Sequence, residues 1–436
     1  MKDRGIKIFG FVLSFLALFA VVAGLNANEA DQSQDRVESL TKFTKVINIV
    51  EKYYVDDVNI SDLVDKSIEG LLSNLDAHSS FLKEKKYKEL KIQTSGEFGG
   101  LGITVGIKDG ALTVISPIEG TPADKAGLEA GDIILKIDNH STLNMTIDEA
   151  VNLMRGKPGT PIELTIVRKS ATKPFVKKII RDIITVESVY TKDVEDHDGI
   201  LYIRVVSFDR HVVEDVKKAL KDKKNLKGVI LDLRNNPGGL LDQAVGLTNL
   251  FVDEGVIVSQ RGRIKNEDKE FLANSKGTIK DIPISVLVNK GSASASEIVS
   301  GSLQDHKRAV VVGEETFGKG SVQIILPINN KEALRLTVAE YYLPSGRTIQ
   351  AVGVIPDIEI AQGKVPADSD SFSVKEAELK KHLEGELEKI EPLPKKEREK
   401  EEENKDTVTT ENINSDIQLK SALDAIKTWE ILNSRR

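Results

Sequence analysis

The spacing of apolar residues changes twice along the chain. Between about residues 40 and 90 they recur three and four positions apart, which predicts amphipathic helices. Between about residues 96 and 170 short apolar runs alternate with Gly, Pro and Asp clusters, which predicts strands joined by turns. From about residue 180 to residue 361 apolar strands alternate with helical stretches. The pattern therefore predicts a helical module, a small β-rich domain and an α/β domain.

Two apolar runs characterise the α/β domain. GVILDL at 228–233 and ISVLV at 284–288 are nearly continuous in apolar residues, as expected for strands that helices cover on both faces. Helices are expected at 212–220, 240–251 and 294–306. The domain should therefore be a sheet between layers of helices.

The composition changes again after about residue 363. The run KKEREKEEENK at 395–405 is typical of a solvated helix or of disorder, and a binding tail is the alternative. The final stretch is amphipathic, and we expect it to dock on the body of this chain or on a second subunit. The predicted apolar stripe of that helix consists of Leu419, Leu423, Ile426 and Trp429.

Length, charge and composition exclude several classes of function. The 436 residues suffice for two or three domains. The formal net charge of −7 is mixed in sign, without the basic excess that nucleic acid requires, so we expect no nucleic-acid partner. The chain has no cysteine, which excludes a thiol nucleophile, Cys-ligated zinc and disulfides. It also contains no HExxH pair or aspartate dyad, so we expect neither a metal nor a cofactor.

The N-terminus has the pattern of an export signal. Lys2, Arg4 and Lys7 precede an uncharged apolar run at 8–24. As a helix this run spans about 25 Å, a little less than the roughly 30 Å hydrocarbon core of a membrane. A cleaved signal and an uncleaved anchor in the inner membrane both stay open. Either one predicts a protein outside the cytoplasm, in the periplasm or on the outer face of the cytoplasmic membrane.

A glycine-rich stretch precedes the first strand of the β-rich domain. Gly100 and Gly102 flank Leu101, and the strand begins near Ile103. Glycines let a backbone approach a ligand closely, and successive amides can hold a chain-terminal carboxylate. A domain whose glycines only make turns is the alternative.

The stretch NKGSASASEIVSGSLQ at 289–304 suggests a nucleophile. Ser294 stands among the small residues Gly291 and Ala293 directly before a predicted helix, so a substrate backbone could approach it. The same stretch fits a helix-capping box with Glu297 as the partner of the serine. This stretch alone leaves both interpretations open.

Lys319 offers the base that a serine nucleophile needs. It lies between two glycines after an apolar strand, which favours a defined, partly buried position. A desolvated lysine can act as the base, and lowering its pKa from about 10.4 to 7 or 8 corresponds to roughly 4 kcal/mol, which burial can supply. His306 is twelve residues along the helix from Ser294, or about 18 Å, too far to serve.

The order of the motifs resembles a known family. SPIEGTPADKAGLEAGDIILKIDNHS is similar to PDZ domains. Followed by DLRNNPGG, NKGSASASEI and VVGEETFGKGSVQ, it makes residues 40–365 resemble the carboxyl-terminal processing, or tail-specific, proteases. The resemblance implies Ser294 as nucleophile, Lys319 as general base and Gln323 as the residue that orients the lysine amine. Attack on a peptide carbonyl would give an acyl-enzyme that water hydrolyses.

The resemblance also implies the binding sites. A groove between the strand after Gly102 and the helix at 146–154 would bind a peptide tail, with amides of Gly100, Leu101, Gly102 and Ile103 on its carboxylate. An oxyanion hole would use the N–H of Ala295 and that of Gly239 in preference to Gly238. Asp232 and Arg234 are expected to be structural.

The expected partners are proteins with free, apolar C-termini and a second copy of this chain in a homodimer. A non-catalytic PDZ adaptor is the alternative function. A PDZ protease with a His/Asp/Ser triad would need a Gly-Asn-Ser-Gly-type elbow before the PDZ domain, and the sequence has none.

The predicted fold is multidomain α+β, and its core is expected to be a crotonase/ClpP-like α/β serine protease. The predicted parts are a signal peptide or anchor at 1–27, a helical module at 28–95, a PDZ domain at 96–180, the protease core at 181–365, a charged linker at 366–410 and an amphipathic helix at 411–436.

Overall fold

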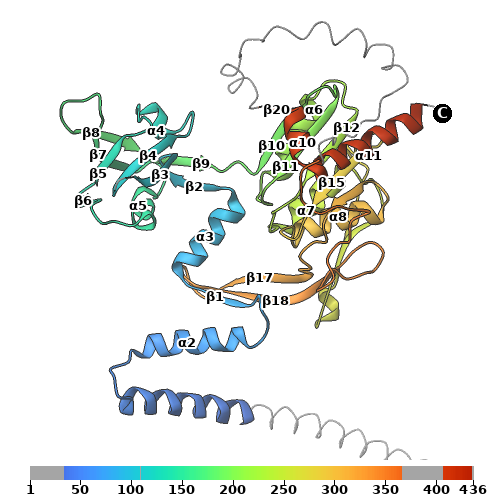
Figure 1. The fold of residues 1–436 in the computed structure, drawn as a ribbon. Coiled ribbons are helices and arrows are strands. Elements are labelled where there is room, and N and C mark those ends of the chain that lie inside the picture. Colours follow the sequence, from blue (N-terminus) through green and yellow to red (C-terminus); the bar gives the residue numbers. More distant parts are fainter. Residues whose placement is uncertain (1–33, 109, 366–405, 435–436) are drawn as a thin grey trace, which may run out of the picture. The chain divides into compact units, whose positions relative to one another are not determined.

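The structure is a computed structural model that describes residues 34–108, 110–365 and 406–434 (Figure 1). The predicted export segment lies outside these residues. None of the helices in the described ranges is both long and apolar enough to span a bilayer. Contacts divide the chain into two compact units, residues 1–81 with 334–336 and the remainder, and each is described separately.

The first unit contains the part of the predicted helical module that precedes residue 82, and the rest of that module, α3 (Glu84–Ser95), belongs to the second unit. A helix over residues 34–53 is followed by α2 (Ile60–Ser73), which begins where the Asn59 side chain accepts the Ser61 N–H at 2.8 Å. Most of the apolar side chains of this module are exposed, including Phe43 and Ile49, whereas Leu72 is buried. The module therefore leaves much of its apolar surface in contact with solvent.

The second unit begins with α3 and the β-rich domain. The domain sheet has the strand order β3-β4-β5-β7-β8, so β3 is an edge strand. Ile162, Leu164 and Ile166 alternate with more exposed residues along β7 and are fully buried. The elements are α3 (Glu84–Ser95), β2 (Glu97–Gly100), β3 (Ile103–Lys108), β4 (Ala111–Pro117), α4 (Pro122–Lys125), β5 (Ile133–Ile137), β6 (His140–Ser141), α5 (Ile147–Met154), β7 (Pro161–Val167), β8 (Phe175–Ile180) and β9 (Asp182–Thr185).

The α/β domain is built on a seven-stranded sheet with the order β19-β16-β15-β12-β11-β10-β20. The strands β11, β12, β15, β16 and β19 run parallel, and β10 is antiparallel to β11. Its elements are β10 (Val189–Val194), β11 (Ile200–Val205), α6 (Val212–Asp222), β12 (Gly228–Asp232), α7 (Leu241–Asn249), β15 (Ile284–Val288), α8 (Ala295–Asp305), β16 (Val310–Gly313), β19 (Ile358–Glu359) and β20 (Thr407–Val408).

Alternate residues of these strands bury opposite faces of the sheet. Leu231 and Val286 face a cluster with helices α6, α7 and α8, whereas Ile230 and Leu287 face a second cluster with the C-terminal helix. All five residues of β12 and of β15 are buried. The prediction of strands covered on both faces is confirmed.

A second sheet extends the α/β domain. In it β13 (Val256–Gly262) pairs with β14 (Lys269–Leu272) and with β18 (Ala333–Tyr342), and β17 (Ser321–Pro327) pairs with β18. The short helix η1 (Lys265–Glu267) joins β13 to β14.

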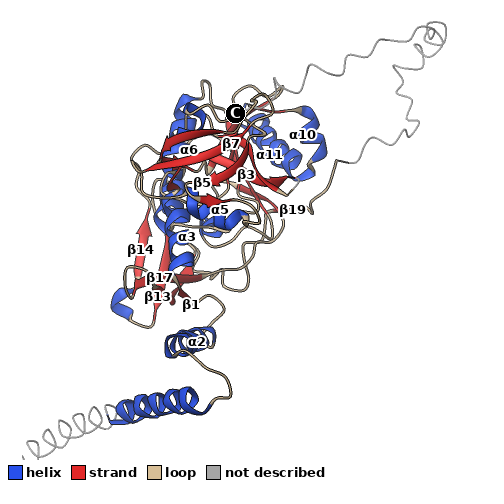
Figure 2. Ribbon diagram, turned by 90° about the vertical axis from the view of Figure 1, so that its left-hand side faces the viewer, coloured by secondary structure: helices blue, strands red, loops and turns tan. Residues whose placement is uncertain are grey.

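The described C-terminal segment starts at Asp406 and contains β20, α10 (Thr410–Ser415) and α11 (Ile417–Ser434). Helix α11 contacts β12, β15 and β16 (Figures 1 and 2). Leu419, Leu423 and Ile426 are buried there, but Trp429 is 42% exposed. The predicted stripe is therefore buried at its first three residues and partly exposed at Trp429, which lines a pocket with Ile284 and Ile426.

Candidate active site

Three loops at one edge of the sheet carry the candidate catalytic residues. The strands β12, β15 and β16 are parallel neighbours, so the loops that follow them meet at their carboxyl ends, where open α/β sheets bind ligands. The first loop contains Gly238 and Gly239, the second leads to Ser294, and the third contains Lys319. The sheet topology thus gathers the residues that the motifs predicted.

Ser294 is the residue immediately before helix α8. Its backbone has φ 56° and ψ −110°, a conformation that L-residues rarely adopt and that costs of order 1–3 kcal/mol. Ala295 follows as the first helical residue, so its N–H is one of the amides that a helix start leaves without an intrahelical acceptor. Such strain persists only where the surroundings fix the conformation, and it is common at functional sites.

The buried carboxylate of Glu297 connects the serine loop to the lysine loop. Its Oε2 accepts the Ser294 N–H at 2.7 Å and the Lys319 N–H at 2.9 Å. Its Oε1 accepts the Thr316 hydroxyl at 2.6 Å and the Gly318 N–H at 2.7 Å. Glu297 has no exposed surface, so these four donors replace its hydration. Its predicted capping contact with Ser294 is present, and its contacts to the second loop extend that prediction.

Both glycines beside Lys319 are required by close backbone packing. Gly318 has φ 87° and accepts the Ala351 N–H at 2.8 Å. Gly320 donates to Gln350 Oε1 at 2.9 Å, and a Cβ on Gly320 would approach the Gln350 nitrogen to 2.5 Å. The lysine backbone is therefore fixed on both sides, as its glycine setting predicts.

Gln323 lies in β17, four residues after Lys319. Its side-chain nitrogen donates to Ser321 Oγ at 2.8 Å and to Thr337 Oγ1 at 3.3 Å. These two bonds orient the amide. The predicted contact between Gln323 and the lysine amine stays a prediction.

The glycine loop after β12 approaches the start of α8. A Cβ on Gly238 would lie 2.9 Å from Ser294 Cβ and 3.0 Å from the Ala295 nitrogen. The Gly238 N–H already donates to Asn236 Oδ1 at 2.9 Å. Gly239 has φ 151°, and a Cβ there would approach the Phe208 carbonyl oxygen to 2.2 Å. The Gly238 amide is therefore already engaged within its own loop, and the predicted role of Gly239 stays a prediction.

The glycine loop of the β-rich domain is also tightly packed. Gly102 has φ 75°, and a Cβ there would lie 2.3 Å from Thr121 Cβ. The Thr121 hydroxyl donates to the Gly102 carbonyl at 3.0 Å, and Ala123 N–H donates to the Leu101 carbonyl at 2.8 Å. Gly100 ends β2, Ile103 begins β3, and β3 contacts α5. The loop thus precedes a sheet edge beside a helix, as predicted.

Sequence reasoning missed two residues that build the site. Asn236 is buried, donates to the Val205 carbonyl at 2.8 Å, and accepts the Ala293 N–H and the Ser296 hydroxyl on its own carbonyl at 3.0 and 2.9 Å. Thr316 bridges Glu297 and the Val354 N–H. The two adjacent asparagines of DLRNNPGG could have pointed to Asn236, but no local sequence pattern distinguishes Thr316.

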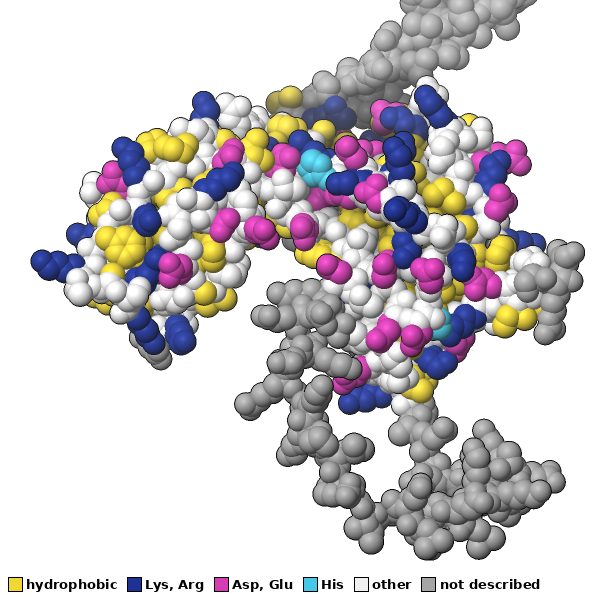
Figure 3. Space-filling view, turned by 90° about the horizontal axis from the view of Figure 1, so that it is seen from above, with side chains coloured by type: hydrophobic (Ala, Val, Ile, Leu, Met, Phe, Trp, Pro, Cys, Tyr) yellow, Lys and Arg dark blue, Asp and Glu magenta, His cyan; other side chains and the backbone are white. Residues whose placement is uncertain are grey.

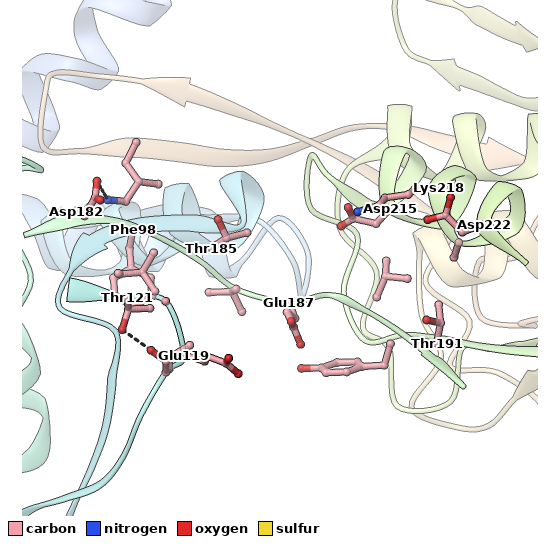
Figure 4. Close-up of a pocket in the computed structure, with 18 of the residues that line it drawn as sticks. Phe98, Glu119, Thr121, Asp182, Thr185, Glu187, Thr191, Asp215, Lys218 and Asp222 are labelled. Atoms are coloured by element: carbon pink, nitrogen blue, oxygen red, sulfur yellow. Dashed lines mark hydrogen bonds between the residues drawn. The ribbon is translucent and has the colours of Figure 1, made fainter. Parts of the chain in front are cut away.

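Other features of the surface lie away from these loops. Figure 4 shows a pocket that apolar and charged side chains line together, among them the acidic Glu119, Asp182, Glu187 and Asp215, and burial raises the pKa of Asp215. It includes neither Ser294 nor Lys319. On the face drawn in Figure 3, basic side chains lie among acidic ones. In the described ranges no group of three or more His, Cys, Asp or Glu residues could hold a metal ion.

Comparisons with known proteins identify the family. Profiles of peptidase family S41, of a PDZ domain and of the activating protease CtpB N-terminal domain match residues 199–360, 113–168 and 19–86. The carboxy-terminal-processing protease of Bartonella bacilliformis is 43% identical over 390 residues, which cover 88% of this chain and 89% of that protein. The Bacillus subtilis carboxy-terminal processing proteases CtpA and CtpB are 34% and 32% identical over 370 and 397 residues; the matches cover 82% and 86% of this chain, and 77% and 81% of those proteins.

The fold and these matches define a serine-type peptidase with a PDZ domain. More specifically, the chain belongs to the carboxy-terminal processing proteases of peptidase family S41. The predicted family and fold class are confirmed.

Proposed function

We propose that this chain is an endopeptidase that cleaves with a Ser294/Lys319 dyad and binds the C-terminal tails of its substrates through its PDZ domain. One observation carries the proposal: Glu297 Oε2 accepts the backbone N–H of both Ser294 and Lys319. A single buried oxygen thus holds the loops of the nucleophile and of the base side by side. A serine that merely capped a helix would not require this second loop.

In the proposed reaction, Ser294 Oγ attacks the peptide carbonyl carbon while the neutral Lys319 amine takes its proton. The C–N bond then breaks, and the leaving amine receives that proton from Lys319. The resulting ester is the acyl-enzyme. Water attacks the ester, with Lys319 again as the base, and releases the new C-terminus and the free serine. Gln323 would orient the lysine amine through its amide oxygen.

The oxyanion that forms during each attack would accept two amides. Ala295 N–H points out of the start of α8, and Gly239 N–H comes from the loop that packs against Ser294. Gly238 is the poorer candidate because its N–H already donates to Asn236. Losing one such donor typically costs 10²–10³-fold in kcat.

The PDZ domain would bind a free tail at the edge of β3. The amides of Leu101 and Gly102 donate to no acceptor among the described residues, so they could hold a terminal carboxylate. The partly buried side chains of Ile103, Val105 and Val151 belong to the neighbouring β3 and α5. An apolar C-terminal side chain therefore fits this groove better than a charged one.

Cleavage of an unfolded protein with an apolar C-terminus tests the proposal. We expect Ser294→Ala and Lys319→Ala to lower kcat by at least about 10³-fold, because the serine is a weak nucleophile without its base. Amidating the substrate C-terminus should raise KM and leave the dyad intact. Near wild-type cleavage by Lys319→Ala would contradict the dyad, and tail binding without cleavage by the wild-type chain would favour the adaptor.

We also propose that the protease acts outside the cytoplasm, in the periplasm or at the inner membrane, because its first residues have the pattern of an export signal. Cell fractionation together with N-terminal sequencing tests this. Protein recovered in the cytoplasm with an intact N-terminus would contradict it, and an intact N-terminus in the membrane fraction would identify an anchor.

The exposed apolar residues of the helical module support a homodimer. Phe43, Ile49 and Leu71 are 46%, 57% and 63% exposed, which is costly for single helices in water. Sedimentation of a chain that lacks residues 1–27 should give a dimer that Phe43→Glu dissociates. A monomeric wild-type chain would contradict the proposal.

A further inference from the structure

Arg234 connects the candidate catalytic loop to the C-terminal segment. Its side chain is only 11% exposed, and its Nη1 donates to Asp416 Oδ2 at 2.7 Å and to Gln418 Oε1 at 3.1 Å. Its Nε and Nη2 donate to Asp232, at the end of β12. Because a guanidinium is planar and its donors have fixed directions, these partners determine where Arg234 lies.

The partners of Arg234 in the C-terminal segment are themselves fixed. Gln418 is 1% exposed and donates through Nε2 to the Ile360 carbonyl at 2.8 Å. Asp416 Oδ1 accepts the Leu419 N–H at 3.1 Å at the start of α11. Leu419 belongs to the apolar cluster that joins α11 to the sheet. The segment therefore holds two polar groups in constant positions against Arg234.

The catalytic loop begins directly after Arg234. The Asn235 N–H donates to Asn289 Oδ1 at 2.8 Å, and the Asn236 carbonyl accepts the Ala293 N–H and the Ser296 hydroxyl. The loop then reaches Gly239, five residues after Arg234. A displaced Arg234 would therefore shift the loop that faces Ser294, and displacements of about 1 Å can cost 10²-fold in rate.

We propose that Asp416 and Gln418 are positioning residues for peptide-bond cleavage: through Arg234 they hold the loop that presents the Gly239 N–H to the oxyanion. Neither residue touches the reacting atoms. The inference rests on the proposed function, because it needs Gly239 to act in the reaction. On this account the segment after residue 405 supports the active site as well as covering the sheet.

The test compares Asp416→Asn with Asp424→Asn in the full-length protein. Asp424 lies in α11, which begins directly after Asp416, and it pairs with Lys420 at the surface, so it controls for loss of a negative charge in this segment. We expect Asp416→Asn to lower kcat about tenfold with KM changed less than twofold, and Asp424→Asn to behave as wild type. Asp416→Glu keeps the charge and should restore at least a third of kcat.

Titration of the active site separates positioning from folding. A serine-reactive probe that labels Ser294 counts the competent molecules, and kcat is then expressed per labelled site. A residue needed only for folding would lower the labelled fraction and leave kcat per site unchanged, and that result would overturn the inference. Gln418→Met removes the hydrogen bond to Arg234 but changes no charge, and it should lower kcat per site about threefold to fivefold.

Ser294→Ala measured in parallel separates this inference from the proposed function. If Ser294→Ala abolishes cleavage and Asp416→Asn matches Asp424→Asn, then only the positioning role is wrong. If Ser294→Ala still cleaves, the proposed function itself fails.

Discussion

The tail-binding loop at 100–103 and the catalytic loop at 237–239 both offer glycine amides beside a strand, and each is proposed to bind a negatively charged oxygen. They differ in how they are held. The first is held through its carbonyls at a sheet edge, where Ile118 N–H and the partly exposed Thr121 hydroxyl donate to Gly102 and Ala123 N–H donates to Leu101. The second is held by fully buried side chains: Asn236 Oδ1 accepts the Gly238 N–H, and the Ser296 hydroxyl donates to the Asn236 carbonyl just before the loop.

This difference follows from the ligand that each loop would meet. A terminal carboxylate is stable, so a tail can adjust to an edge strand as it binds. An oxyanion exists only transiently during the reaction, so the N–H groups that stabilise it must be preorganised. Changes in the first loop should therefore alter KM, and changes around the second should alter kcat.

The largest effect is expected from Glu297→Gln. An amide in place of the carboxylate puts its own NH₂ against backbone donors, so we expect kcat to fall by at least about 10³-fold and stability by about 3–5 kcal/mol. Glu315→Gln, an exposed carboxylate in the same loop, is the matched control. Cleavage assays and urea unfolding measure both quantities. Activity within tenfold of wild type would mean that Glu297 does not hold the two loops together.

The next effect is expected from Gly239→Ala. A Cβ would approach the Phe208 carbonyl oxygen to 2.2 Å, so the loop must move and its N–H must leave the oxyanion position. We expect kcat to fall about 10²–10³-fold with little change in KM. Steady-state kinetics on one peptide measures the two separately. A change confined to KM would remove the proposed distinction between the loops.

A smaller effect is expected from Gly102→Ala. A Cβ there would lie 2.3 Å from Thr121 Cβ, whereas Gly120, with a similar φ of 74°, has open space around it. Gly102→Ala should raise KM about tenfold for substrates with a free C-terminus and leave kcat unchanged, because it disturbs a ground-state contact. Gly120→Ala is the control. Equal KM values for free and amidated tails in the wild type would contradict a role for this loop.

The smallest effect is expected on the stability of the PDZ domain, from Asp132, a buried residue outside the tail-binding loop at 100–103. Burial alone would raise the pKa of Asp132, but hydrogen bonds from Arg168 and from the Glu129 N–H outweigh it, and the net pKa is lowered. The folded carboxyl thus stabilises the domain above its unfolded pKa of about 3.9 and loses this contribution as the pH falls through the folded value.

Asp132→Asn should therefore lower PDZ stability by about 1–3 kcal/mol at pH 7 and remove its pH dependence below about pH 4. Hydrogen exchange of β5 and β7 peptides reports this within the full chain. Glu129→Gln is the control, since that side chain also pairs with Arg168 but is 62% exposed. Equal exchange in the two variants would contradict the account.

Short sequence patterns predicted the buried strands and the glycine-rich loops of the fold. Nearly continuous apolar runs identified β12 and β15, and glycine settings identified the loops of Ser294 and Lys319. Helical periodicity predicted the stripe of α11 but not the burial of each member, so the 42% exposure of Trp429 is seen only in the structure. The contacts of Glu297 with Gly318, and of Arg234 with Asp416, join residues 21 and 182 positions apart, so only the folded chain reveals them.

Labelling of Ser294 by a serine-reactive probe, followed from pH 5 to pH 10, tests the dyad most directly. The account predicts labelling at Ser294, with a rate that rises with pH and levels off below the ordinary lysine pKa of about 10.4. In Lys319→Ala the rate should fall at least about 10²-fold, because the hydroxyl then lacks its base. Labelling at another serine, or an unchanged rate in Lys319→Ala, would contradict the dyad.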